Sequence, residues 1–214
     1  MEQTGRLPDF THETAALAQG RLNVVGVDEA GRGPLAGPVT AAAVRLTEGR
    51  IPAGLNDSKK LTAARRLALY YIIMEVAEVS VAHASVGEID EMNILRASHL
   101  AMVRAINGLT VPPDFALIDG NLIPRNMPGD GLAIIRGDAL CLSIAAASIV
   151  AKVTRDAIMV DLAQQHPGYG WGRNAGYPTR DHVAALLNLG VTAHHRRSFR
   201  PVHNILYQEI SITR

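Results

Sequence analysis

The chain has 214 residues, of which 48% are hydrophobic and 19% are charged, so it can bury a full core and is not an intrinsically disordered protein. Its single cysteine, Cys141, excludes an intramolecular disulfide scaffold and a multi-cysteine zinc site. No apolar run reaches the roughly 18 residues of a membrane span. Residues 1–20 carry no export signal, so we expect a cytoplasmic protein without membrane contact.

The net charge of +1 gives no global sign of a nucleic-acid partner, but the basic residues are unevenly distributed. Between residues 151 and 200, seven lysines and arginines outnumber three aspartates. A basic final third beside a neutral remainder is compatible with a polyanion-binding face. Charges at this density are also ordinary on a solvated surface, so the distribution alone decides nothing.

The apolar pattern predicts one α/β domain. Residues 1–22 are polar, and we expect an irregular lead-in before a single domain at 23–214. Apolar runs and alternation predict strands at 23–28, 38–46, 80–86, 115–119 and 132–136. Helical spacing predicts helices at 62–79, 93–106, 142–165 and 179–189, with a helical extension from about 168 to the end. The early hairpin indicates a sheet with an antiparallel element.

Carboxylates stand at the ends of three predicted strands. Asp28 and Glu29 close the first, and the glycines after them allow a bend that brings both side chains to one site. Asp119 closes the strand FALID, and Asp138 follows the strand LAIIR. Taken alone, the pair would be an acidic strand end before a turn, and Asp138 would only complement a helix N-terminus.

Taken together, the four carboxylates predict a metal centre, because sites in α/β sheets form beyond the ends of adjacent strands. With no cysteine or paired histidines nearby, the oxygen ligands favour Mg²⁺ or Mn²⁺ over zinc. Two such ions about 4 Å apart are the common device for hydrolysing phosphodiesters. The expected catalytic and metal-binding residues are Asp28, Glu29, Asp119 and Asp138.

Seven motifs occur in order along residues 23 to about 202: VDEAGRGPLAGPV (27–39), DSKKL (57–61), EIDEMNILRASHLAM (88–102), LIDGN (117–121), GDALCLSIAAASIVAKVTRD (137–156), YGWGRNAGYPTRDH (169–182) and HHRRSF (194–199). With them, the chain resembles ribonuclease HII, the bacterial type 2 ribonuclease H family. The resemblance implies a ribonuclease H-like fold, in which helices flank a mixed five-stranded sheet and a C-terminal helical segment follows.

The resemblance also implies an activity. It predicts a metal-dependent endoribonuclease that cleaves the RNA strand of RNA–DNA hybrids. Such an enzyme also incises 5′ of single ribonucleotides embedded in duplex DNA, and it leaves 3′-hydroxyl and 5′-phosphate ends. The family's four metal-site acids correspond to the four carboxylates named above. We expect a monomer, and a sliding-clamp contact through the tail is left open by the sequence.

Further residues match the family's substrate contacts. Gly31, Arg32 and Gly33 match its reader of the 2′-hydroxyl, and glycines let backbone groups approach a sugar closely. Tyr177 matches the tyrosine that packs against the deoxyribose after the ribonucleotide. In isolation, each motif would be an ordinary turn.

Candidate phosphate contacts are Lys59, Lys60, Ser148, Lys152, Arg155 and Arg180. Each has a structural alternative: lysines in loops are usually solvated, Ser148 suits tight helix packing, and Asp156 is placed to pair with Lys152. For His194 to Arg197 we expect basic surface or docking of the C-terminal segment.

Two other functions compete with this interpretation. A non-catalytic module that binds hybrids would not need a complete set of four acids. A small-molecule phosphatase would leave the Gly31–Gly33 loop and Tyr177 unexplained.

Overall fold

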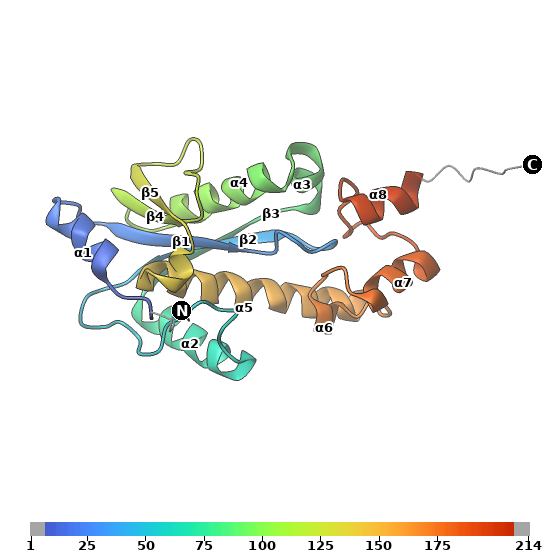
Figure 1. Ribbon diagram of the computed structural model, residues 1–214, viewed down its shortest axis with the longest axis horizontal. Coiled ribbons are helices and arrows are strands. Elements are labelled where there is room, and N and C mark those ends of the chain that lie inside the picture. The colour runs from blue at the N-terminus through green and yellow to red at the C-terminus, as the bar shows by residue number, and fades with distance from the viewer. Residues whose placement is uncertain (1–6, 208–214) are drawn as a thin grey trace, which may run out of the picture.

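The computed structural model describes residues 7–207, in which five strands form one sheet covered by helices on both faces (Figure 1). The elements are α1 (Thr11–Ala18), β1 (Val24–Ala30), β2 (Val39–Arg45), α2 (Ala63–Val76), β3 (Glu78–Ala84), α3 (Val86–Met92), α4 (Ile94–Asn107), β4 (Phe115–Asp119), β5 (Asp130–Ile134), the 3₁₀ turn η1 (Gly137–Ala139), α5 (Leu142–Gln165), α6 (Trp171–Asn174), α7 (Arg180–Leu189) and α8 (Arg200–Tyr207). All five predicted strands and all four predicted helices are present, with ends that differ by a few residues.

The sheet is mixed, as expected, with strand order β3-β2-β1-β4-β5. β1 and β2 are antiparallel, with Glu29 opposite Ala41, and β2 continues antiparallel to β3. β4 runs parallel to both β1 and β5. The carboxyl ends of β1, β4 and β5 therefore lie at one edge of the sheet, where sites form in α/β folds.

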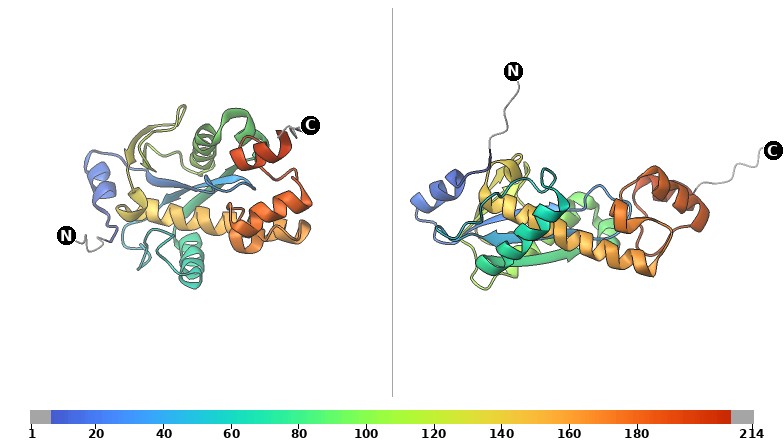
Figure 2. Two further views of the ribbon diagram at one scale, coloured as in Figure 1. Left: turned by 45° about the vertical axis from the view of Figure 1, so that its right-hand side comes forward. Right: turned by 90° about the horizontal axis from the view of Figure 1, so that it is seen from below.

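Small side chains bring the helices close to the sheet. α4 and α3 cover one face, and α5 and α2 cover the other (Figures 1 and 2). α5 presents buried alanines at 145–147 and 151 to the sheet. A Cβ on Gly26 would lie 2.2 Å from the backbone carbon of Ser143, so only glycine allows this approach of α5 to β1. The contact fixes the start of α5 beside β1.

The predicted irregular lead-in is wrong for residues 11–18, which form α1. Glu13 is buried, and its Oε1 accepts hydrogen bonds from the backbone amide and the hydroxyl of Ser143, at 2.8 and 2.6 Å. Cys141, the N-cap of α5, makes no side-chain cap of its own. Glu13 thus supplies a remote cap for α5. A partner 130 residues away leaves no local pattern, so the sequence could not show it.

The predicted helical extension consists of α6, α7 and α8, which lie beyond the end of α5 (Figure 1). They enclose an apolar cluster around Trp171, Tyr169 and Leu186, together with Met159 of α5 and Leu35. This cluster ties the extension to the loop that follows β1. No helix in residues 7–207 is long and apolar enough to span a membrane.

Candidate active site

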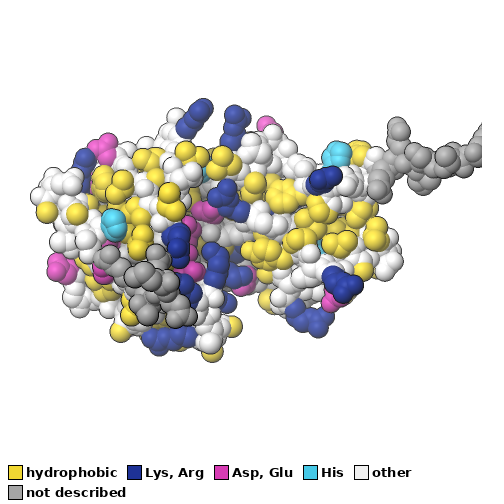
Figure 3. All heavy atoms as spheres, viewed as in Figure 1, with side chains coloured by type: hydrophobic (Ala, Val, Ile, Leu, Met, Phe, Trp, Pro, Cys, Tyr) yellow, Lys and Arg dark blue, Asp and Glu magenta, His cyan; other side chains and the backbone are white. Residues whose placement is uncertain are grey.

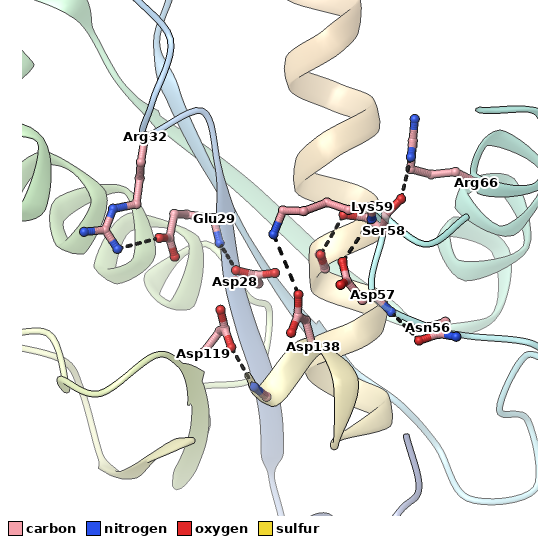
Figure 4. Close-up of polar contacts among 12 residues, drawn as sticks. Asp28, Glu29, Arg32, Asn56, Asp57, Ser58, Lys59, Arg66, Asp119 and Asp138 are labelled. Atoms are coloured by element: carbon pink, nitrogen blue, oxygen red, sulfur yellow. Dashed lines mark hydrogen bonds and ion pairs between the residues drawn. The ribbon is translucent and has the colours of Figure 1, made fainter. Parts of the chain in front are cut away.

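The four predicted acids converge at the edge of the sheet, from β1, β4 and η1 (Figure 4). The amide of Glu29 donates to Oδ1 of Asp28 at 2.6 Å. The amide of Gly137 donates to Oδ1 of Asp119 at 2.7 Å, which ties the end of β4 to the turn that carries Asp138. The topology therefore brings together carboxylates from three separate parts of the sequence.

The carboxylates influence one another electrostatically. Burial, with the charges of Glu29 and Asp119, raises the pKa of Asp28 well above its ordinary value. Burial also raises the pKa of Glu29, although Arg32 opposes the effect. For Asp138, burial and the charge of Asp119 raise the pKa to about 6. The site therefore gathers more negative charge than its own cations offset.

Two cationic side chains lie at its rim. Arg32 Nη1 is 3.2 Å from Glu29 Oε1, and Lys59 Nζ is 3.9 Å from Asp138 Oδ2. Burial lowers the pKa of Lys59, but the charges of Asp138 and Asp28 outweigh it and raise that pKa above its ordinary value. The Lys59 side chain is 78% exposed, so this pair contributes little to stability.

The donor set fits a divalent cation. Across residues 7–207, no three His, Cys, Asp or Glu side chains are drawn together into a ready-made metal cage. The donors here are nevertheless carboxylate oxygens only, which Mg²⁺ and Mn²⁺ prefer. A divalent charge among them would relieve the repulsion that raises the pKa of Asp28. Asp28, Glu29, Asp119 and Asp138 are the residues that would hold it.

The acids open into a cavity of about 290 Å³ that gathers most of the predicted substrate residues. Its lining comprises Asp28, Glu29, Ala30, Gly31, Arg32, Gly33, Ser58, Lys59, Asp119, Ser148, Lys152, Arg155 and Tyr177. Lys60 and Arg180 are exposed outside the cavity, so it does not bring them to the acids. Ser58, which the sequence did not single out, shares a 2.9 Å hydrogen bond with the buried Ser148.

A buried arginine, Arg196, fixes the Gly31–Gly33 loop by hydrogen bonds to its carbonyls. Arg196 Nη2 donates to the carbonyl of Gly31 at 2.6 Å, and its Nη1 donates to the carbonyl of Arg32 at 3.0 Å. The amides of Gly31, Arg32 and Gly33 donate no hydrogen bond within residues 7–207. The loop's carbonyls are therefore used internally, while its N–H groups are free to meet a ligand at the cavity.

One expectation about the basic residues is wrong, and one open alternative is decided. Arg155 does not hold phosphate: it is buried and donates to the carbonyls of Pro38, Ala175 and Ala36, at 2.9, 2.9 and 3.0 Å. For Arg196 the sequence left two alternatives, basic surface or docking of the C-terminal segment. The structure favours docking, because Arg196 is fully buried, and burial lowers its pKa to about 9. Both bind only carbonyls, which a sequence pattern cannot show. The pair expected between Lys152 and Asp156 is present, with 2.7 Å between Lys152 Nζ and Asp156 Oδ1, although Lys152 also lines the cavity.

His195 is likewise buried and belongs to a hydrogen-bonded chain that reaches Tyr177. The Tyr177 carbonyl can only accept, so His182 Nδ1 donates to it at 2.9 Å. His182 Nε2 then accepts from Trp171 Nε1 at 2.9 Å. His195 Nδ1 accepts from the amide of Thr192, so its Nε2 donates to His182 at 3.1 Å. Both histidines are neutral in this arrangement. The chain of hydrogen bonds connects the C-terminal segment, through His195 and His182, to the backbone of Tyr177.

We predict that this histidine chain makes folding sensitive to acid. Burial and the neighbouring histidines lower the pKa of His195 to about 4, below its ordinary 6.5. At this histidine the unfolded chain therefore binds an extra proton between these values, so the contribution of His195 to stability falls as the pH drops from 6.5 to about 4. The expected loss is about 3 kcal/mol, since one pKa unit is worth about 1.4 kcal/mol. Urea unfolding of the wild type and His195→Gln, at several pH values, measures it. If the free energy of unfolding of His195→Gln depended on pH as that of the wild type does, the prediction would be contradicted.

Known proteins are similar to this chain over most of its length. A family model described as Ribonuclease HII matches residues 25–202. The Ribonuclease HII of Cereibacter sphaeroides is 74% identical over 96% of this chain and 97% of that protein. The chain belongs to the ribonuclease HII family. As a member, it is a metal-dependent endoribonuclease that cleaves the RNA strand of RNA–DNA hybrids.

Solved structures share the ribonuclease HII fold. The ribonuclease H2 of Pyrococcus horikoshii OT3 superposes with a TM-score of 0.71 at 28% identity, covering 86% of this chain and 97% of that one. The PCNA:RNase HII complex of Archaeoglobus fulgidus gives 0.68 at 26% identity, covering 84% and 96%. The ribonuclease H-like architecture predicted from the motifs is therefore confirmed.

Proposed function

We propose that this ribonuclease HII incises 5′ of single ribonucleotides embedded in duplex DNA, with Mg²⁺ or Mn²⁺, and leaves 3′-hydroxyl and 5′-phosphate ends. One observation carries the proposal: three of the four acids share one cavity with the Gly31–Gly33 loop and Tyr177. The acids supply a hydrolytic centre, and the loop and ring supply groups that contact a sugar. Cleavage and recognition of a ribonucleotide would then occur in one place.

The carboxylates prepare the site for hydrolysis. Asp28, Glu29, Asp119 and Asp138 would hold two divalent cations, which when bound stabilise negative charge and lower the pKa of a water. The hydrogen bond from Gly137 keeps Asp119 in orientation for this role. Lys59, beside Asp138, adds a positive charge at the rim, where it would contact a phosphate of the substrate. Lys152 and Ser148, in the same cavity, are further proposed phosphate contacts.

Selection of the ribonucleotide falls to other residues. The acids meet phosphates, which RNA and DNA share, so they cannot distinguish the two. The N–H groups of the Gly31–Gly33 loop can donate to a 2′-hydroxyl, which both donates and accepts hydrogen bonds. Arg32 is half-exposed at the rim and can contact a flanking phosphate through its planar fork.

A direct assay tests the proposal. The protein is incubated with duplex DNA that contains one ribonucleotide, with Mg²⁺, with Mn²⁺ and with chelator, and product ends are mapped. We expect incision on the 5′ side in either metal and none in chelator. An intact duplex beside a cleaved RNA–DNA hybrid would overturn the proposed single-ribonucleotide activity.

We predict that Tyr177→Ala reduces incision at a lone ribonucleotide more than cleavage within an RNA tract. Tyr177 is 42% exposed, and its ring lines the cavity beside Gly33, so it can pack on the deoxyribose that follows the ribonucleotide. We expect a loss of roughly tenfold on the first substrate and a smaller loss on the second. Rates on both, with a thermal melt, are compared with Tyr71→Ala, which removes an exposed tyrosine of α2. Equal losses would mean that Tyr177 only positions the backbone.

Three expectations stay predictions: a monomer, a cytoplasmic location and a sliding-clamp contact through the tail. The Archaeoglobus fulgidus relative is solved as a complex with PCNA, which makes such a contact a reasonable proposal here. Residues 208–214 of the tail lie outside the described residues.

A further inference from the structure

A long groove runs beside the active site, between α4 and the loop that follows β4. It has a volume of about 550 Å³, and we call it the α4 groove. Its lining comprises Leu95, Arg96, His99, Leu100, Val103, Leu122, Ile123, Arg125 and Asn126. Neither the hydrolytic centre nor the ribonucleotide contacts described above account for it.

The α4 groove is continuous with the active site. A small hollow of about 40 Å³ lies between them. It shares Leu95, His99 and Leu122 with the groove. It shares Glu29, Arg32 and Asp119 with the catalytic cavity. A chain that passes the acids can therefore continue into the groove without leaving the surface.

The chemistry of the groove suits a sugar–phosphate strand. Arg96 and Arg125 form no side-chain hydrogen bond or ion pair among residues 7–207, and no acid lines the groove. Leu122 and Ile123, which line the same groove, are 48% and 44% exposed. Guanidinium groups bind phosphates, and apolar side chains pack against sugars. Figure 3 shows this face with acidic side chains at its centre, surrounded by basic ones, and an apolar area that ends at basic side chains on the upper rim.

The position of the groove gives the strand a direction. It lies on the α4 face of the sheet, whereas Lys152 and Ser148 line the catalytic cavity from the α5 face, with Tyr177 among them. In the proposed function, Tyr177 contacts the nucleotide on the 3′ side of the ribonucleotide. The strand then crosses the edge of the sheet, and its 5′ flank leaves toward α4.

We propose that the α4 groove binds the 5′ flank of the cleaved strand, with Arg96 and Arg125 on its phosphates. This inference rests on the proposed function, because the direction depends on the role of Tyr177. The groove would add affinity for duplexes that extend upstream of the incision, and its contribution would depend on salt, since each phosphate contact releases counterions.

The test uses duplexes with one ribonucleotide, in which either the 5′ or the 3′ flank of the cleaved strand is shortened with its complement. Binding is measured for Arg96→Ala and Arg125→Ala at several salt concentrations. We expect each variant to weaken binding of the full duplex roughly tenfold and to lower the slope of log K against log salt by about 1. The 5′-shortened duplex should bind all proteins equally. Arg96→Lys, which keeps the charge, should restore most of the affinity.

Arg50→Ala is the matched control, since Arg50 is an exposed arginine outside the site, and it should bind as wild type. The groove assignment is overturned if Arg96→Ala and Arg125→Ala bind the 5′-shortened duplex more weakly than the wild type does. It is also overturned if they bind every duplex as tightly as the wild type. Loss confined to duplexes with a full 3′ flank overturns its direction. A wild-type protein that binds these duplexes but incises none of them would instead overturn the proposed function.

Discussion

Asp119→Asn is expected to lower cleavage of an RNA–DNA hybrid by roughly a hundredfold or more, while hybrid affinity stays within about threefold. Asparagine keeps the shape of the side chain, and its Oδ1 can still accept the hydrogen bond from the Gly137 amide. It cannot supply the negative charge that holds a divalent cation. The substitution therefore removes chemistry without disturbing the turn that carries Asp138.

The measurement is the single-turnover rate at matched metal concentration, with affinity determined separately. Asp130→Asn is a suitable control, because this exposed aspartate pairs with Arg21 at the opposite end of the parallel strands. We expect the control to cleave as wild type. A fully active Asp119→Asn protein would contradict the metal-binding role, and a protein that no longer binds hybrid would show that Asp119 acts in binding instead.

The four acids could be predicted because their signal is local. Asp28 lies near the end of the apolar strand β1, and Asp119 ends β4. An unpaired charge is costly at such a position, so the presence of these two acids needs an explanation. The parallel arrangement of β1, β4 and β5 then brings them to one edge. Secondary structure followed equally local rules: β4 and α5 begin and end where apolar periodicity places them.

The supports of the site could not be predicted, because their partners are distant. Glu13, Arg155 and Arg196 are charged residues, which are usually exposed, yet all three are buried in this fold. Two of them bind main-chain carbonyls, and a carbonyl carries no sequence signature. α3 was missed for another reason: it is only seven residues long, and its capping box begins at Ser85, inside the strand predicted at 80–86.

These supports indicate why the Gly31–Gly33 loop keeps its shape. Arg196 and Arg155 together fix carbonyls of the loop and of the Ala36–Pro38 segment that follows. Neither guanidinium has a carboxylate partner among residues 7–207. The buried positive charge lies beside a cavity that is proposed to receive phosphates, where it adds attraction for a polyanion.

Gly31→Ala is expected to damage both folding and cleavage, whereas Gly33→Ala should leave stability nearly unchanged. Gly31 has a φ of +97°, a conformation that alanine adopts only at a cost of about 1–2 kcal/mol. A Cβ on Gly31 would lie 1.9 Å from Nε of Arg155. Arg155 cannot move aside freely, because it is buried and holds three carbonyls. Strain and collision add, and we expect a loss of about 3 kcal/mol in the free energy of unfolding.

Gly33 offers the matched comparison within the same loop. Its φ is not in the left-handed region, and a Cβ there would meet only the half-exposed Tyr177 ring, with Cε1 at 3.3 Å and Cδ1 at 3.9 Å. A shift of a few tenths of an ångström in that ring relieves the contact, so stability should change by less than about 0.5 kcal/mol. Urea unfolding of both variants measures the difference in stability. Their cleavage rates are then measured on an RNA–DNA hybrid. If Gly31→Ala were as stable as Gly33→Ala, the close approach of Arg155 beneath the loop would be refuted, and with it the reason that the loop requires glycine at this position.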